Sequence, residues 1–301
     1  MTVQIQNSKF KIQKTASATQ AAILLSTLIL LLSVGCGNLS RERYGQETVK
    51  MAVLPVYSMD NMSARYLPLL AYLSRETGYD VQYVASSSYS GFGVTVEGSG
   101  AQLVLCDPIS FLTLAKTRQA EALAIIEGEG GAVQGPGLVI APRGAAIQSL
   151  SQLRGLRIGC ASQMSAEGFL SQALALRAEG IDVRRECTLV PCGQMDEVVA
   201  KVARGQLDAG FIGLGLWDEK LSQELVIVAR TEPVPNWVAA AMPQAAPDIR
   251  AKVTAALLGL RAGNDEHRKI LDGLRAARFA ALPPAALSAL AAAAAEEGIP
   301  Y

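Results

Sequence analysis

The residues best suited to chemistry lie in one stretch, 159–165, with the sequence Gly-Cys-Ala-Ser-Gln-Met-Ser. It follows the apolar residues Leu156 and Ile158 and precedes an apolar run, so the pattern predicts a strand, a polar turn and a helix. Ser162 or Ser165 can cap that helix by accepting a backbone N–H bond. Because the first N–H groups of a helix attract negative charge, the turn predicts a seat for an oxyanion. The alternative is a structural helix cap with no ligand.

Thiols offer a second kind of chemistry, since besides Cys36 the chain has Cys106, Cys160, Cys187 and Cys192. Four cysteines of an exported protein allow three pairings. Cys160 and Cys192 follow predicted neighbouring strands and are close enough to bridge, whereas an extended strand of about 16 Å separates Cys187 from Cys192. Cys106 is then the thiol left free. A free thiol in a cleft suits a thiophilic ligand such as trivalent arsenic, and the alternative is a small buried side chain.

Composition excludes several classes of protein. The chain has 301 residues, a formal net charge of zero and 50% hydrophobic residues, which suits one or two domains with a sizeable core and argues against nucleic-acid binding. His267 is the single histidine and lies in a polar helical pattern, so a Ser-His-Asp or Cys-His site would depend on it alone. We therefore predict no enzymatic activity and no cofactor.

The N-terminus predicts export. Basic residues precede an apolar run at 21–32, which is shorter than the roughly 20 residues that span a bilayer. The sequence at 32–36, Leu-Ser-Val-Gly-Cys, resembles the bacterial lipobox, in which the cysteine is lipidated. We predict a lipoprotein-type signal peptide over 1–36, lipidation of Cys36, and a tether over 37–47. The protein is then a membrane-anchored lipoprotein of the periplasm or outer cell surface. The alternative is a plain cleavable signal with an incidental cysteine.

The rest of the chain alternates strands and helices, which predicts parallel α/β structure. Glycine-rich segments at 127–131 and 135–137 break this pattern before it resumes, and 231–237 resembles a crossover back. We predict a first lobe of residues 48–137 plus 232–301 and a second lobe of residues 138–231. Two crossover hinge segments join these α/β lobes, and a ligand is expected in the cleft between them.

Several segments carry a family resemblance: 66–73 with Gly78 ending its helix, Ser88-Tyr89, Asp107-Pro108-Ile109-Ser110-Phe111, 147–158, 206–210 and 235–260. Their order and spacing resemble the periplasmic solute-binding proteins of phosphate, phosphite and phosphonate ABC transporters. The resemblance implies a type II periplasmic-binding-protein fold that closes on its ligand by hinge motion.

The resemblance implies ligand contacts from both lobes. The first lobe would contribute Ser87, Ser88, Tyr89, Cys106 and Asp107, and the second Cys160, Ser162, Gln163, Ser165 and Cys192. The turn departs from the family's Ser-Thr-Ser-Gly by adding Glu167, which would repel a dianion unless it is protonated or turned away. Gly213 lies about where aminophosphonate binders carry an acid, which argues against an aminophosphonate. No metal site is predicted.

The placement of Leu105-Cys106-Asp107-Pro108 resembles a branch of this family that senses arsenic oxyanions through a sensor histidine kinase. The leading prediction is therefore capture of arsenite by a cleft thiol, with the kinase as partner. The alternative is the phosphate, phosphite or phosphonate-binding component of an ABC uptake transporter, with an ABC permease as partner. Alternatives of another class are an enzyme or a thiol and carboxylate metal-ion binder using Cys106, Asp107, Cys160, Met164 and Cys192.

Overall fold

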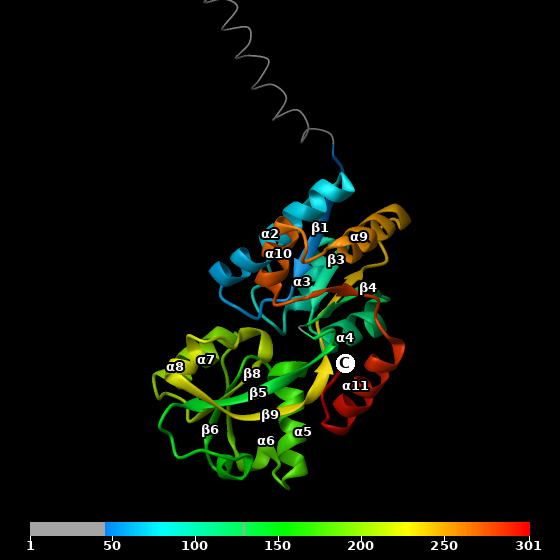
Figure 1. The fold of residues 1–301 in the computed structure, drawn as a ribbon. Helices are drawn as coiled ribbons and strands as arrows, with labels where there is room; N and C mark the ends of the chain where they lie inside the picture. The colour runs from blue at the N-terminus through cyan, green and yellow to red at the C-terminus, as the bar shows by residue number, and fades with distance from the viewer. Residues whose placement is uncertain (1–45, 129) are drawn as a thin grey trace, which may run out of the picture. The chain divides into compact units, whose positions relative to one another are not determined.

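The computed structural model describes residues 46–128 and 130–301, and Thr48–Tyr301 form one compact unit (Figure 1). The predicted signal peptide, the lipidation site Cys36 and most of the tether lie outside the described residues. Within the described part, no helix is both long and apolar enough to cross a membrane.

The first lobe is built on a six-stranded sheet with the order β11-β4-β10-β3-β1-β2. Its strands are β1 (Thr48–Val53), β2 (Asp80–Val84), β3 (Leu103–Cys106), β4 (Glu121–Glu127), β10 (Val238–Ala241) and β11 (Arg278–Ala280). Its helices are α2 (Met59–Thr77), α3 (Phe92–Ser99), α4 (Pro108–Arg118), α9 (Pro247–Gly259) and α10 (Asp265–Leu274). Strand β10 runs antiparallel between β3 and β4, so the sheet is mixed and not purely parallel. The chain returning from the second lobe supplies this reversed strand.

The second lobe is built on a five-stranded sheet with the order β7-β6-β8-β5-β9. Its strands are β5 (Gln134–Pro142), β6 (Arg157–Cys160), β7 (Thr188–Pro191), β8 (Ala209–Gly213) and β9 (Leu225–Pro235). The helical segments are η1 (Leu150–Leu153), η2 (Ala166–Leu170), α5 (Ser171–Ala178), α6 (Val183–Glu186), α7 (Met195–Ala203), η3 (Leu214–Leu216) and α8 (Leu221–Glu224). Segment η2 continues directly into α5, so the helix predicted after the polar turn begins at Ala166.

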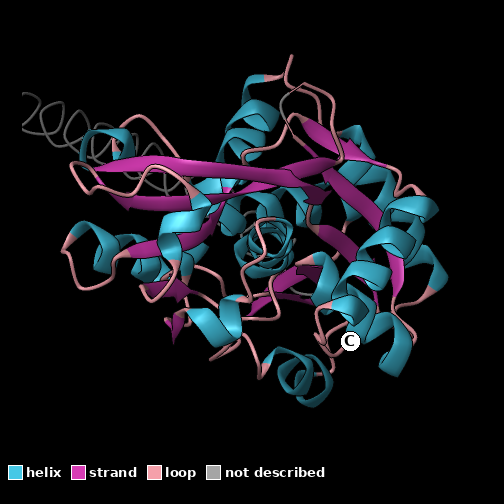
Figure 2. Ribbon diagram, turned by 90° about the horizontal axis from the view of Figure 1, so that it is seen from below, coloured by secondary structure: helices cyan, strands magenta, loops and turns pink. Residues whose placement is uncertain are grey.

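The two longest strands of the second sheet, β5 and β9, pair antiparallel and run side by side toward the first lobe (Figures 1 and 2). The predicted break at 135–137 was wrong, because these residues belong to β5, and the segment predicted as the crossover back, 231–237, begins within β9. Strand β8 pairs with β5 only over 137–140, so Pro136 and its partner Pro233 lie where two strands remain. Prolines are tolerated at such an edge because no further strand needs their missing N–H. The connections between the two sheets are therefore shorter than predicted and consist of residues 128–133 and 236–237.

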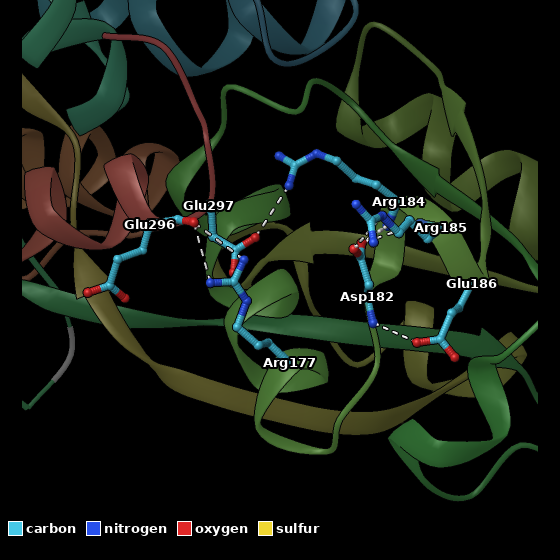
Figure 3. A network of polar contacts seen from close by, with 7 residues as sticks. All are labelled: Arg177, Asp182, Arg184, Arg185, Glu186, Glu296 and Glu297. Carbon is cyan, nitrogen blue, oxygen red and sulfur yellow. Dashed lines mark hydrogen bonds and ion pairs between the residues drawn. The ribbon is translucent and has the colours of Figure 1, made fainter.

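The C-terminal helix α11 (Pro284–Glu296) joins both lobes. Leu290 and Ala294 lie in the apolar core of the second lobe. Just beyond the helix, the Glu297 side chain is only 4% exposed and forms ion pairs with Arg177 at 2.8 Å and Arg184 at 3.3 Å (Figure 3). The last residue accepts a bond from the first lobe, since Lys116 Nζ of α4 lies 3.1 Å from the Tyr301 carbonyl oxygen. The predicted domain boundaries themselves stay a prediction.

Strand β5 passes very close to the η2–α5 helix. The buried Gln172 amide donates to the carbonyl oxygens of Leu138 at 3.2 Å, Ile212 at 3.1 Å and Glu167 at 2.8 Å, which holds the helix against the sheet. A Cβ atom at Gly137 would lie 2.6 Å from the Glu167 carbonyl oxygen and would also overlap the Gln172 amide. Glycine at this position therefore permits the contact that positions the helix start.

We expect Gly137→Ala to destabilise the protein by about 1–3 kcal/mol, because the added methyl group forces the helix and strand apart. Urea denaturation followed by circular dichroism measures the change in the free energy of unfolding. Gly93→Ala in α3 is the matched control, since its added Cβ meets nothing within 4 Å and alanine favours a helix. Equal stabilities for Gly137→Ala and the wild type would contradict the close packing.

Candidate functional site

A pocket of about 440 Å³ lies between the lobes, beside the two connecting segments. This volume is within the range of roughly 300–1,000 Å³ that small-molecule sites have. The first lobe lines it with Tyr57, Arg65, Tyr66, Ile126, Leu274 and Arg275, and the connecting segments line it with Gly128, Ala132, Asn236 and Trp237. The second lobe lines it with Gln134, Gly135, Pro136, Glu167, Leu214, Gly215 and Trp217.

Aromatic rings form much of the pocket wall. The rings of Tyr66, on α2, and Trp237, just before β10, are stacked with their centroids 6.1 Å apart. The Arg65 guanidinium lies over the Tyr57 ring, 4.5 Å from its centroid. These three aromatic side chains are at most 7% exposed, so their ring positions are set by packing. A wall of this kind favours the organic part of a small ligand.

Charged side chains of both signs reach the same pocket. Arg65 donates to the Gly273 carbonyl oxygen at 3.1 Å, and Arg275 Nη2 lies 4.0 Å from an Asp218 carboxylate oxygen. Glu167, in the first turn of η2, accepts a hydrogen bond from Trp237 Nε1 at 3.1 Å. Burial raises the pKa of Glu167, and the Trp237 bond and the Arg65 charge oppose that rise. The pocket therefore offers arginine side chains to an anionic group and a carboxylate to a hydrogen-bond donor.

Glu167 also occupies the space beside Gly213. A Cβ atom at Gly213 would overlap the Glu167 carboxylate. Position 213 itself has no acid, as the sequence shows, but the Glu167 carboxylate lies beside it. The prediction against an aminophosphonate stays a prediction.

The start of the η2–α5 helix is bonded to the first lobe. Ser165 caps it, as predicted, by accepting a bond from Gly168 N at 3.1 Å. The Ala166 N–H donates to Asp107 Oδ2 at 2.9 Å, and the Ser165 hydroxyl lies 3.3 Å from the same oxygen. Asp107 Oδ1 accepts from Ile109 N at 2.8 Å and so caps α4. The Asp107 carboxylate thus accepts hydrogen bonds from the first turns of two helices, one in each lobe.

Other direct bonds join the lobes near this carboxylate. The Tyr89 hydroxyl donates to the Met164 carbonyl oxygen at 3.2 Å. Met195 N donates to the Val56 carbonyl oxygen at 2.7 Å, and Ser58 N donates to Asp196 Oδ2 at 2.8 Å. Protein groups therefore fill the space between Tyr89 and the helix start.

None of the residues predicted to contact a ligand lines the pocket. Ser87 and Ser88 are exposed, and the Ser88 hydroxyl accepts from Gly91 N. Ser162 accepts from Met164 N, while Gln163 is exposed and accepts from Arg184. Ser165, Asp107 and Tyr89 do lie close together, but their polar groups bond to other protein groups and do not face the pocket. As direct ligand contacts, these residues stay a prediction.

The cysteines differ from the expected arrangement. Cys106 is fully buried in the core of the first lobe, because β3 lies between β1 and β10, and it does not line the pocket. Cys160 and Cys192 lie side by side, joined by a 2.8 Å bond from Cys192 N to the Cys160 carbonyl oxygen, and all four described cysteines are free. Burial raises the pKa of Cys160 to about 12 and that of Cys106 well above its usual value. Both thiols are therefore protonated at neutral pH, whereas metals and arsenic bind thiolates.

The metal-binding alternative gains no support. Among residues 46–128 and 130–301, no group of three or more histidine, cysteine, aspartate or glutamate side chains is arranged to hold a metal ion.

Sequence reasoning missed the pocket residues themselves. Arg65 and Tyr66 belong to a helix that the sequence predicted, and Trp237 lies at the predicted end of the return crossover. The tryptophan next to a hinge was the available signal. The sequence did not indicate that the face of α2 with Arg65 and Tyr66 lies next to that connecting segment.

Burial raises the pKa of Asp107 from 3.8 to about 7, against the opposing hydrogen bonds from Ala166 and Ile109. Between about pH 4 and pH 7 the folded protein therefore keeps a proton that the unfolded chain has lost. This group's contribution to stability is fully present below pH 4 and falls, by about 1.4 kcal/mol per pH unit, as the pH rises toward 7.

We expect the free energy of unfolding of the wild type, relative to Asp107→Asn, to decrease between pH 4.5 and pH 7. Urea denaturation of both proteins across this range measures the difference. Glu167 is present in both proteins, and its charge raises the pKa of Asp107, so the interaction between the two carboxylates adds to the decrease in the wild type. A wild-type minus Asp107→Asn difference in the free energy of unfolding that stays constant or increases with pH would contradict the raised pKa of Asp107.

Comparison with known proteins places this geometry in a family. The family model described as "ABC transporter, phosphonate, periplasmic substrate-binding protein" matches residues 51–287. A curated relative, the phosphate-import protein PhnD of Mycolicibacterium smegmatis, is 27% identical over 176 residues, which span 55% of this chain and 54% of the relative. The match thus covers about half of that protein's length.

Solved structures share the fold. PhnD1 from Prochlorococcus marinus, in complex with methylphosphonate, has a TM-score of 0.77 at 17% identity, covering 84% of this chain and 99% of its own. A binding protein component of an ABC phosphonate transporter from Pseudomonas aeruginosa has a TM-score of 0.75 at 17% identity, covering 84% of this chain and 87% of its own. The type II periplasmic-binding-protein fold, with two α/β lobes and two connecting segments, is thereby confirmed. The chain belongs to the periplasmic substrate-binding proteins of phosphonate ABC transporters.

Proposed function

We propose that the protein captures a small organophosphonate or organic phosphate in the interlobe pocket and delivers it to an ABC permease. The observation that carries this proposal is a 440 Å³ pocket lined from both lobes and containing Arg65, Arg275 and stacked aromatic rings. The arginines suit the anionic group, because one guanidinium group can donate two parallel hydrogen bonds to two phosphate oxygens. The aromatic wall suits the organic substituent.

Glu167 favours a substituent that carries a hydrogen-bond donor. Its carboxylate lies in the pocket wall and faces the Arg65 charge, so an ammonium or hydroxyl group of the ligand would find an acceptor there. 2-Aminoethylphosphonate combines a phosphonate with an ammonium group in one small molecule. It is therefore the first probe to test.

The family match supports the uptake alternative over arsenite sensing, which the comparisons do not support. The burial of Cys106 weakens the thiol contact on which the arsenite prediction depended. Delivery to a permease, anchoring through a lipidated Cys36 and residence on the outer side of a membrane complete the proposal.

We expect the wild type to bind 2-aminoethylphosphonate, and Gly215→Leu to weaken that binding at least about tenfold by filling the pocket. A Cβ at Gly215 meets only Arg275 Cβ, at 3.9 Å, so the substitution directs bulk into the pocket without disturbing the core. Isothermal titration calorimetry with 2-aminoethylphosphonate, methylphosphonate, inorganic phosphate and arsenite measures the affinities.

Gly263→Leu is the matched control, because Gly263 is exposed, lies outside the pocket and has nothing within 4 Å of an added Cβ. Its affinities should equal those of the wild type. Binding of arsenite but of no phosphorus compound would overturn the proposal, as would equal affinities in Gly215→Leu and the wild type.

A further inference from the structure

The donors at the start of the η2–α5 helix are already occupied by a carboxylate. The Ala166 N–H and the Ser165 hydroxyl both point at Asp107 Oδ2, at 2.9 Å and 3.3 Å. Ser165 and Ala166 are fully buried and Asp107 is 1% exposed. An external anion could use these donors only if Asp107 left them.

The surroundings of this carboxylate also disfavour a second anion. Glu167 follows directly in the same helix turn, and its negative charge acts on Asp107. From the first lobe, the buried Tyr89 hydroxyl is engaged with Met164, and the neighbouring Cys106 is a buried thiol. A phosphate dianion placed here would therefore face two carboxylates at short range, which is strongly unfavourable in a buried site.

Positive charge is found instead in the adjoining pocket. Arg65 and Arg275 line that pocket, whereas Asp107, Ser165 and Tyr89 do not. The Arg65 guanidinium is fixed by the Tyr57 ring and the Gly273 carbonyl oxygen, so it is already oriented for binding.

We propose that Asp107 determines the specificity of this site: its carboxylate takes the place of a ligand oxyanion at the helix start, so that the ligand's anionic group is bound by Arg65 and Arg275. The inference rests on the proposed function, since it concerns the same interlobe ligand. It assigns Asp107 the role of excluding bare phosphate dianions from the helix start while tying the two lobes together.

Asp107→Ser tests the exclusion. A serine hydroxyl can still cap α4 at Ile109 N, while the shorter neutral side chain frees the Ala166 N–H. At pH 8, where phosphate is a dianion and Asp107 is ionised, we expect inorganic phosphate to bind Asp107→Ser at least about tenfold more tightly than the wild type. Calorimetric titration with inorganic phosphate measures this gain.

Asp182→Ser is the matched control, because Asp182, labelled in Figure 3, also caps a helix, α6, and does not line the interlobe pocket. It should bind phosphate as the wild type does. If Asp107→Ser does not fold, as judged by circular dichroism, Asp107→Gly replaces it, since glycine is tolerated before the first turn of a helix and also frees the Ala166 N–H. Phosphate affinity in the folded variant that is no higher than in the wild type would overturn the inference.

Arg65→Met tests where the anionic group is bound. We expect it to weaken binding of 2-aminoethylphosphonate at least about tenfold, and unchanged affinity would overturn the inference. The two proposals fail differently. If the wild type binds none of the phosphorus compounds, the proposed function fails, whereas the phosphate gain of Asp107→Ser does not depend on that outcome.

Discussion

The bond between Asp107 and the start of the η2–α5 helix is the constraint around which both lobes are arranged. A buried carboxylate is costly unless hydrogen-bond donors surround it. Here one lobe supplies Ile109 N and the other supplies Ala166 N and the Ser165 hydroxyl. The strand end at β3, the cap of α4 and the cap of η2 must therefore stay in register with one another. Nearby bonds such as Met195 N to the Val56 carbonyl oxygen reinforce that register.

The pocket follows from the way the chain passes between the lobes. Strands β5 and β9 leave the second sheet as a two-stranded ribbon, and only residues 128–133 and 236–237 remain as connections. This brings Trp237 beside Tyr66 and within hydrogen-bond distance of Glu167. The pocket is consequently formed beside the connecting segments, where a change in the angle between the lobes would change its shape.

Membership of the phosphonate-binding family did not place the ligand contacts. The polar turn predicted as an oxyanion seat forms where expected, and Ser165 caps it, yet its free donors are taken by the protein itself. Cys106, predicted as the specific contact, lies in the core. Glu167, predicted as a repulsive departure, lines the pocket and fills the place beside Gly213. The motif positions are thus kept, while other side chains line the pocket.

The sequence by itself determined the elements whose signals are local. Helix α2 ends at Gly78, as predicted, and this glycine adopts the left-handed conformation with φ of 76°. Caps, glycine stops and hydrophobic periodicity act within a few residues, so they can be read along the chain. Only the tertiary structure decided that Asp107 meets Ala166, 59 positions away, and that Glu167 meets Trp237, 70 positions away. These contacts depend on how two sheets and their connecting ribbon pack, and no local pattern specifies that packing.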